Sequence, residues 1–540
     1  MLGIKFDNLR GDLFGGLTAG VVALPLALAF GEASGAGPIA GLYGAIIVGF
    51  FAALFGGTGS QISGPTGPMI VVFAGVFGAL SGNPGLVFAT VVLAGVIQVA
   101  FGIFKLGQYI KLVPYPVVSG FMTGIGCIII ALQASRLFGH EPEGSGTIPA
   151  LTAIPGAVLD PNWVALGLGL LTLIIVFTWP AKMAKIVPPP LAALVIGTLL
   201  STIIAGAPLL GDIPTGLPSF VIPEFRADTI VIVFEAAFVL ALLGSLDSLL
   251  TSLVADNMTR TKHNSNQELI GQGIGNVFAG FFGGIPGAGA TMRTVVNIRT
   301  GGLTKISGMI HSALLFAVVV SLGPLAAQIP HAVLAGILVK VGYDIVDLAY
   351  LKRAHKGPRW DLLLMVLVLT LTVFVDLITA VIAGVVLASL AFVKQMADLQ
   401  LESIKNLEEG IDQLVPSEEE EILKDVADSV TLFDFSGPLS FGAAADLGHH
   451  VRLKAKGSSA LVIDFLQVPF LDVSAARAVA TICQDATEAK KRIFISGMNS
   501  KVKQVLIALQ EDSVLPEMFY ENRKDALEAT RKFILAAQKN

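Results

Sequence analysis

Two related stretches, Phe51-Ala-Ala-Leu-Phe-Gly-Gly57 and Phe278-Ala-Gly-Phe-Phe-Gly-Gly284, decide the fold because glycine interrupts a long apolar run in each of them. The first leads into Ser63-Gly-Pro-Thr-Gly-Pro-Met69 and the second into Gly287-Ala-Gly-Ala-Thr-Met292. Glycine and proline at these places predict a break in the helix, followed by the start of a new half-helix.

The two stretches belong to an internal repeat. When Gly44 is aligned with Gly271, seven of the fourteen positions through Gly57 and Gly284 are identical, at an offset of 227 residues. Paired interruptions in the two halves of a membrane protein are typical of a transport site, because half-helices that start near the midplane direct free backbone N–H groups at an anion.

The composition agrees with a membrane protein. Of the 540 residues, 54% are hydrophobic and 14% are charged, against about 25% charged residues in soluble domains. A net charge of −5 and the lack of a basic arm argue against nucleic acid as a partner. We expect no disulfide between Cys127, in a membrane segment, and Cys483, in the soluble tail. The N-terminus lacks the basic-then-apolar pattern of a signal peptide.

Apolar segments recur along the first three quarters of the chain. We expect about fourteen of them, starting near residues 13, 38, 66, 87, 113, 164, 190, 230, 270, 292, 306, 332, 362 and 378. Lys and Arg alternate along this order in the way that the positive-inside rule predicts for two cytoplasmic termini. The predicted outer loops, near residues 140–162 and 207–228, contain few basic residues.

The sequence after Lys394 predicts a separate soluble domain. We expect a membrane domain at residues 1–398, an acidic linker at 399–428 and an α/β domain at 429–540. In the last domain the pattern predicts strands at 430–435, 460–465 and 492–496, which alternate with helices at 441–455, 474–489 and 501–509.

At this point the chain resembles the SulP family of anion transporters, over nearly its whole length. The motifs that carry the resemblance are Arg10-Gly-Asp-Leu-Phe-Gly-Gly-Leu-Thr-Ala-Gly20, Ile62-Ser-Gly-Pro-Thr-Gly-Pro-Met69 and Asn264-Ser-Asn-Gln-Glu-Leu-Ile-Gly-Gln-Gly273. The tail resembles a STAS domain through Ile463-Asp-Phe465 and Leu471-Asp-Val-Ser-Ala475. Within the family, these sequence motifs are most similar to those of the sodium-dependent bicarbonate branch.

The resemblance implies a polytopic α-helical fold of seven plus seven inverted segments, divided into a core and a gate. It also implies a cytoplasmic α/β STAS domain, a homodimer and a place in the cell (inner) membrane. An unidentified regulatory partner of the STAS domain is a further expectation.

Four residues at the two half-helix starts are candidate anion ligands. Thr66 and Thr291 occupy comparable places, and their hydroxyls, with the backbone at Gly289 and Ala290, can bind oxyanion oxygens without a full positive charge. The alternative is that both threonines are simple N-caps.

Two further positions near the expected anion site rest on the resemblance. In animal relatives an aromatic residue at the position of Phe30 lines the anion site. The alternative for Phe30 is packing against lipid or the protein core. Relatives often have Gln where this chain has Leu26, so one polar contact is absent here. Arg293 matches the site arginine of many exchangers in the family, although the bicarbonate branch usually lacks a charge there. Its functional interpretation is an anion anchor, and the alternative is an arginine that reaches cytoplasmic water.

Asp247 and Thr251 are the candidate cation ligands, because residues four apart share one helix face and a carboxylate inside a span is expensive. In the bicarbonate branch the matching Asp and Thr help to bind sodium, and a proton is the other candidate. The alternative is a structural pair of Asp247 with Arg293. Glu235 is a weaker candidate for a second ion group.

These residues predict a secondary-active transporter of a small inorganic anion that works by alternating access. Bicarbonate uptake coupled to sodium is the first interpretation; a proton-coupled sulfate permease, or a chloride, bicarbonate or sulfate exchanger anchored by Arg293, is the second. An anion channel and a nucleobase transporter are rivals of other kinds. An enzyme is not expected, because no nucleophile–base pair or metal-ligand cluster is apparent in the sequence. The only expected cofactor is sodium, as the coupling ion. In the tail, Ser474 matches a serine that accepts phosphate in soluble STAS relatives, but an ordinary N-cap is the favoured interpretation.

Overall fold

The computed structural model describes residues 6–80, 83–110, 114–141, 147–184, 187–211, 218–375 and 377–402 of the membrane part. In the C-terminal part it describes residues 405–406, 419, 421–422, 426, 429–441, 444, 447, 451, 455, 457–508 and 516–538. The chain forms two compact units, Met1–Val386 and Leu387–Asn540.

The first unit is mainly helical. Its longer helices are α1 (Leu9–Ala33), α2 (Pro38–Phe55), α3 (Gly67–Ala79), α4 (Pro84–Ile103), α6 (Tyr115–Leu137), α7 (Thr147–Leu159), α8 (Trp163–Thr178), α10 (Pro189–Ile203), α11 (Ile230–Thr259), α12 (Ser265–Phe281), α13 (Thr291–Arg299), α14 (Lys305–Ala326), α15 (His331–Ile345), α17 (Arg359–Phe374) and α18 (Leu377–Glu402), the last of which runs into the second unit. Short helices are α5 (Gly107–Ile110), α9 (Ala181–Ala184), α16 (Leu348–Leu351) and the 3₁₀ turn η1 (Ala354–Lys356). Within the described residues, six helices are long and apolar enough to cross a membrane, or seven if one bent pair is counted as a span.

Each segment predicted from the sequence coincides with one of these helices. The predicted outer loop at residues 140–162 is wrong in one respect, because it contains α7. This helix contains Pro155 in its interior, and the chain bends by 114° between α7 and α8. Asn162 caps the N-terminus of α8, because its side chain accepts hydrogen bonds from the Val164 and Ala165 N–H groups. The segment 140–162 contains four prolines, two of them within α7, yet the mostly apolar residues of 147–159 form a helix that packs on α6.

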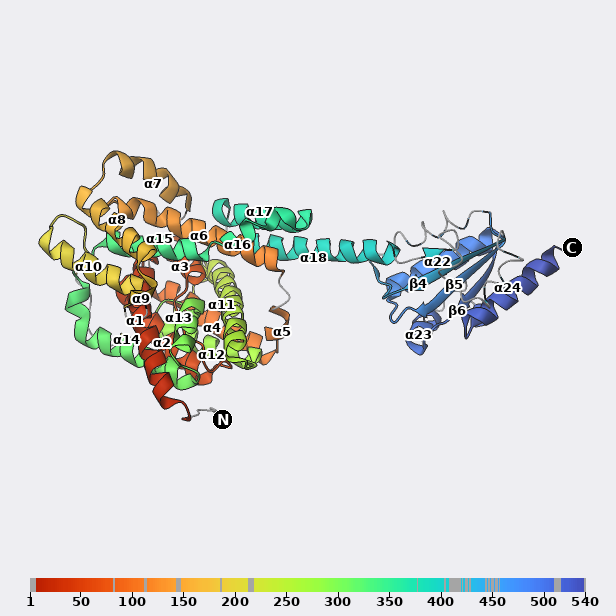
Figure 1. Cartoon of the computed structure of the whole chain (residues 1–540), viewed down its shortest axis with the longest axis horizontal. Coiled ribbons are helices and arrows are strands. Elements are labelled where there is room, and N and C mark those ends of the chain that lie inside the picture. Colours follow the sequence, from red (N-terminus) through yellow and green to blue (C-terminus); the bar gives the residue numbers. More distant parts are fainter. Residues whose placement is uncertain are drawn as a thin grey trace. The chain divides into compact units, whose positions relative to one another are not determined.

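The two copies of the repeat lie against each other. β1 (Ser63–Gly64) pairs antiparallel with β2 (Ala288–Gly289), so that Ser63 lies opposite Gly289. Around this crossing α12 packs against α2 and α4, and α14 packs against α1 and α2 (Figure 1, red and orange helices among green ones). Because α3 follows β1 and α13 follows β2, the strand pair brings the starts of both half-helices together.

Glycine contacts between the copies are reciprocal. A Cβ added to Gly284 would lie 2.8 Å from the Gly44 nitrogen, and one added to Gly271 would lie 2.4 Å from the Gly56 nitrogen. The 227-residue offset maps Gly44 onto Gly271 and Gly57, next to Gly56, onto Gly284. The glycines that identify the repeat in the sequence are therefore the places where its two backbones come too close for any side chain.

The second unit contains a five-stranded sheet. β4 (Val430–Ser436), β5 (Ala460–Gln467), β6 (Arg492–Ser496) and β7 (Phe519–Tyr520) run parallel, and β3 (Lys405–Asn406) joins antiparallel at the edge next to β4. α22 (Val473–Glu488) and α23 (Ser500–Ala508) cover one face and α24 (Arg523–Ala537) the other. The three predicted strands and the last two predicted helices are confirmed; the predicted helix at 441–455 lies mostly outside the described residues.

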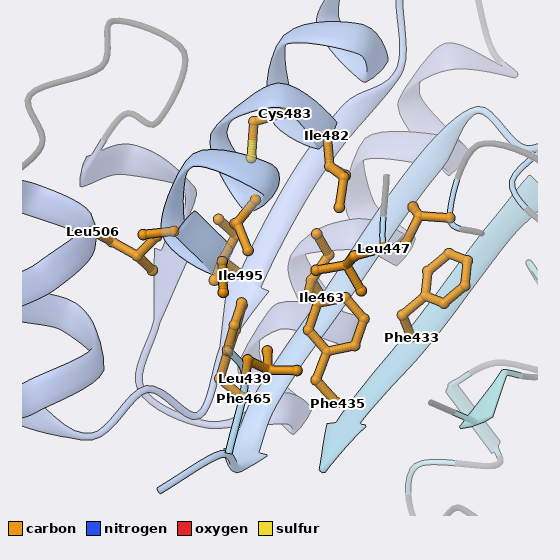
Figure 2. Close-up of a cluster of buried hydrophobic side chains, with 14 of the residues drawn as sticks. Phe433, Phe435, Leu439, Leu447, Ile463, Phe465, Ile482, Cys483, Ile495 and Leu506 are labelled. Atoms are coloured by element: carbon orange, nitrogen blue, oxygen red, sulfur yellow. The ribbon is translucent and has the colours of Figure 1, made fainter. Parts of the chain in front are cut away.

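Alternation along the strands divides the domain's core in two. Phe433, Phe435, Ile463 and Phe465 are fully buried on the face of α22, where Cys483 joins them (Figure 2). The intervening residues of the same strands point to the other face, against α24. A parallel sheet covered on both faces needs such apolar strands.

Candidate functional site

The first hydrogen bonds of α3 and α13 place two helix N-termini at the crossing of the repeats. Ile70 N–H donates to the Thr66 carbonyl at 3.1 Å, and Thr294 N–H donates to the Ala290 carbonyl at 2.9 Å. The N–H groups that precede these have no acceptor one turn back. They form two regions of partial positive charge, one from each half of the chain.

A chain of oxygens from α11 runs between these two N-termini. The Thr66 hydroxyl donates to Asp247 Oδ2 at 2.9 Å. One turn further along α11, the Thr251 hydroxyl donates to the Gly289 carbonyl at 3.0 Å and lies 2.7 Å from the Thr291 hydroxyl. The sequence predicted each of these residues, and the structure brings them together in one cluster.

The threonines do not act as side-chain N-caps. Thr66 occupies the N-cap position of α3, but its side chain makes no capping hydrogen bond and turns to Asp247 instead. The N-cap of α13 is Ala290, and Thr291 is its first helical residue. Thr291 is exposed and Asp247 is half-buried, so the cluster is open along one side.

Arg293 is buried beside this cluster, with 3% of its surface exposed. Its Nη2 donates to the Pro65 carbonyl at 2.6 Å, and a Cβ added to Gly64 would lie 2.8 Å from Nη1. Among the described residues no carboxylate lies within ion-pair distance of Arg293, Asp247 included. The side chain thus neither pairs with Asp247 nor lies exposed, and its role as an anion anchor stays a prediction.

Next to the start of α3 lies a small hollow of about 10 Å³, which is room for about one water molecule. Phe30 and Gly67 line one side, and Ile129, Gln133 and Leu338 line the other, from α6 and α15. The hollow thus adjoins an N-terminus with free N–H groups and is walled by helices of different parts of the unit. Phe30 lines this hollow, and its contact with an anion stays a prediction.

Two other candidates lie apart from the cluster. Glu235 is exposed on α11, three turns before Asp247. Ser474 is exposed as the second residue of α22, and the expected N-cap role is wrong because Asp472 is the cap and accepts the Ala475 N–H at 2.8 Å. An aspartate two residues before Ser474 was the signal that favoured the correct assignment.

Sequence reasoning missed the residues that support β1 and β2. Glu268 is fully buried and accepts the N–H groups of Gly57 and Thr58, both at 2.9 Å, and the Gln61 side-chain amide at 2.8 Å. Ser248 accepts the Gly289 N–H at 3.0 Å. A glutamate inside an apolar repeat was a signal, because a buried carboxylate requires partners.

Comparison with known proteins agrees with this architecture. A model of the sulfate permease family matches residues 9–368.

The chain belongs to the sulfate permease (SulP) family.

A STAS domain model matches residues 421–526. The chain is 45% identical to "Bicarbonate transporter BicA" of Synechocystis, over 97% of this chain and 94% of that protein. It is 33% identical to "Putative sulfate transporter YvdB" of Bacillus subtilis, over 93% and 94% of the two chains.

Solved structures give the same result. The transmembrane domain of a cyanobacterial bicarbonate transporter, BicA, matches with a TM-score of 0.67 and 51% identity, over 70% of this chain and 98% of that one. The murine anion transporter Slc26a9 in its inward-facing state matches with a TM-score of 0.82 over 99% of this chain and 92% of that one, at 20% identity, which establishes the fold alone. The protein is a multi-pass membrane anion transporter with a STAS domain, and not an enzyme.

Proposed function

We propose that this SulP protein takes up bicarbonate together with sodium by alternating access. The oxygen cluster carries the proposal. It contains the carboxylate of Asp247, the hydroxyls of Thr66 and Thr251 and the Gly289 carbonyl, next to the N-termini of α3 and α13. Such oxygens suit a hard cation, and the N-termini suit an anion. The similarity to bicarbonate transporters supports this choice of substrate.

The charges of the site support coupling. With Asp247 ionised and Arg293 charged, the empty site is neutral. One sodium ion with one bicarbonate keeps it neutral, and a net charge in a medium of low dielectric is costly. Loading both ions together therefore avoids a charged intermediate.

The arrangement of helices supports the alternating movement. α1–α4 and α11–α14 pack mainly on one another, whereas α6, α8, α10, α15 and α17 form a second group. We assign the first group to the core and the second to the gate of a seven-plus-seven inverted repeat, with the hollow between them. Two cytoplasmic termini, a homodimer and location in the inner membrane complete the proposal.

The domain limits and the role of the tail are part of the same proposal. We place the membrane domain at residues 1–398, the acidic linker at 399–428, which lies largely outside the described residues, and the STAS domain at 429–540. A regulatory role of this domain, with Ser474 as a modification site, is supported by the exposure of that serine at the start of α22.

One observation favours a second candidate. Because Arg293 is buried without a carboxylate partner among the described residues, it can hold an anion without any cation. Exchange of chloride, bicarbonate or sulfate would use the site in this way, and proton-coupled sulfate uptake would add a proton at Asp247.

The test is uptake of radiolabelled bicarbonate and sulfate into proteoliposomes, with and without an inward sodium gradient, for wild type and Arg293→Gly. Sodium-driven, saturable bicarbonate uptake is the expected result. Sodium-independent sulfate uptake or exchange that Arg293→Gly abolishes would replace the proposal with the second candidate. Unitary conductance, or flux that rises without saturation, would instead indicate a channel.

A further inference from the structure

Three side chains from distant parts of the sequence meet in a cluster that shares no residue with the oxygen cluster. Glu32 lies near the end of α1, Glu141 follows α6, and His331 begins α15. His331 Nδ1 lies 3.2 Å from Glu32 Oε1 and 3.4 Å from Glu141 Oε1, and ligand atoms of all three lie within 4.8 Å of one another. Nothing in the transport proposal uses this group.

The hydrogen bonding of His331 indicates which ring nitrogen is available. Nε2 lies 3.1 Å from the Leu209 carbonyl, which can only accept, so Nε2 carries the hydrogen. Nδ1 is buried and makes no hydrogen bond of acceptable geometry, although two carboxylate oxygens lie near it. In the neutral ring its lone pair faces two negative groups. A proton on Nδ1, which would complete ion pairs with Glu32 and Glu141, or a metal cation between the three groups would remove this repulsion.

The two distances from Nδ1 are compatible with a tetrahedral metal as well as with ion pairs. Zinc binds His nitrogen and carboxylate oxygen at about 2.0–2.2 Å, so two ligands of a tetrahedral site are about 3.3–3.5 Å apart. The two measured separations from Nδ1 are close to this range. A backbone carbonyl that accepts the hydrogen of the other ring nitrogen is also the usual support of a zinc-bound histidine.

We propose that Glu32, Glu141 and His331 form a binding site for a divalent transition-metal cation of the zinc class. Glu141 is 63% exposed, which gives the cation a path from solvent and leaves room for water as a fourth ligand. Arg136 lies 4.0 Å from Glu141 and offsets one carboxylate.

The position of the site gives it a consequence for transport. The hollow is lined further along the same three helices, by Ala33 of α1, Gln133 of α6 and Leu338 of α15. A bound cation would link α1 and α15 to the segment that follows α6 and would oppose their separation. Inhibition of uptake by the metal rests on the alternating movement proposed above, whereas binding of the metal does not.

The experiment measures zinc binding to the purified full-length protein by calorimetry after treatment with a chelator. We expect one saturable site in wild type and at least tenfold weaker binding in His331→Gln, because loss of a mere supporting residue already costs 10- to 100-fold. The Gln amide can still donate to the Leu209 carbonyl, so this variant keeps the hydrogen bond and loses only the ligand. Glu32→Gln is the second ligand variant, and His355→Ala, at an exposed histidine of η1, is the matched control.

Two further readouts make the outcome decisive. X-ray absorption of the zinc-loaded protein should show N and O ligands at about 2.0–2.2 Å, and zinc should slow uptake by wild type more than by His331→Gln. Absence of saturable binding in wild type, or equal binding by wild type and His331→Gln, would overturn the site. If wild type binds zinc, His331→Gln does not, and wild type transports no bicarbonate, the metal site stands and the proposed function is refuted.

Discussion

Replacement of Asp247 by Asn tests the cation site with little change of shape. The Asn side chain has the same size, and its Oδ1 can still accept the Thr66 hydroxyl, which now donates to Asp247 at 2.9 Å. The variant therefore removes the negative charge and keeps the hydrogen bond that joins α11 to the start of α3. A change in sodium dependence then reports the charge and not the loss of a contact.

The expected size of the effect follows from Coulomb's law. A cation held about 4 Å from the carboxylate interacts with it by about 4 kcal/mol at an effective dielectric constant of about 20. Every 1.4 kcal/mol is a tenfold change in a binding constant, so the sodium concentration for half-maximal uptake should rise on the order of 10³-fold. At ordinary sodium concentrations the variant would take up almost no bicarbonate.

The assay is initial bicarbonate uptake into proteoliposomes over a range of external sodium. Glu235→Gln is the matched control, because it makes the same chemical change at an exposed position of the same helix, and it should behave as wild type. A sodium dependence of Asp247→Asn that equals that of wild type would refute the reasoning, and so would an equal loss in both variants.

Two other predictions concern packing and the tail. In Gly289→Ala the added Cβ would lie 2.3 Å from Gln61 Nε2, so we expect a loss of about 1–3 kcal/mol in the free energy of unfolding, seen as a lower midpoint of thermal unfolding. The control is Gly167→Ala, whose Cβ meets nothing within 4 Å and which should leave the midpoint unchanged. Equal midpoints for the two variants would contradict this prediction. Burial raises the pKa of the Cys483 thiol to about 12, so in a Cys127→Ala background a maleimide at pH 8 should label the protein only after denaturant is added. The labelling rate should rise with pH, because the thiolate is the reactive form. Rapid labelling without denaturant would show that the STAS core opens.

Much of the fold was predictable because it depends on local patterns. Apolar length gives the helices, and the alternation of strands and helices gives the tail domain. α7 was missed because prolines in a segment between spans favour a loop unless the segment packs on a neighbouring helix, and that packing is not visible in the sequence. The N-cap of α22 was misassigned by two residues for a similar reason, since Asp472 and Ser474 are both good caps and the backbone conformation decides between them.

The candidate site was predictable in its members but not in its connections. Thr66, Asp247, Thr251 and Thr291 were each identified from a break or from a polar residue inside an apolar span. That Thr66 bonds to Asp247, and that Arg293 bonds to a backbone carbonyl and not to Asp247, depends on which faces of α3, α11 and α13 meet. The supporting carboxylate of Glu268 was not singled out, because its partners other than Gln272 are more than two hundred residues away in the sequence.

The sequence by itself determined the repeat, the membrane character and the two interrupted helices, because hydrophobic length and glycine positions act over a few residues. Only the tertiary structure decided how the copies cross, since the pairing of β1 with β2 requires close approach of two backbones from opposite halves of the chain. The same long-range packing brings Glu32, Glu141 and His331 together. No local pattern marks these three residues, because their common feature is a place in space at the end of three helices.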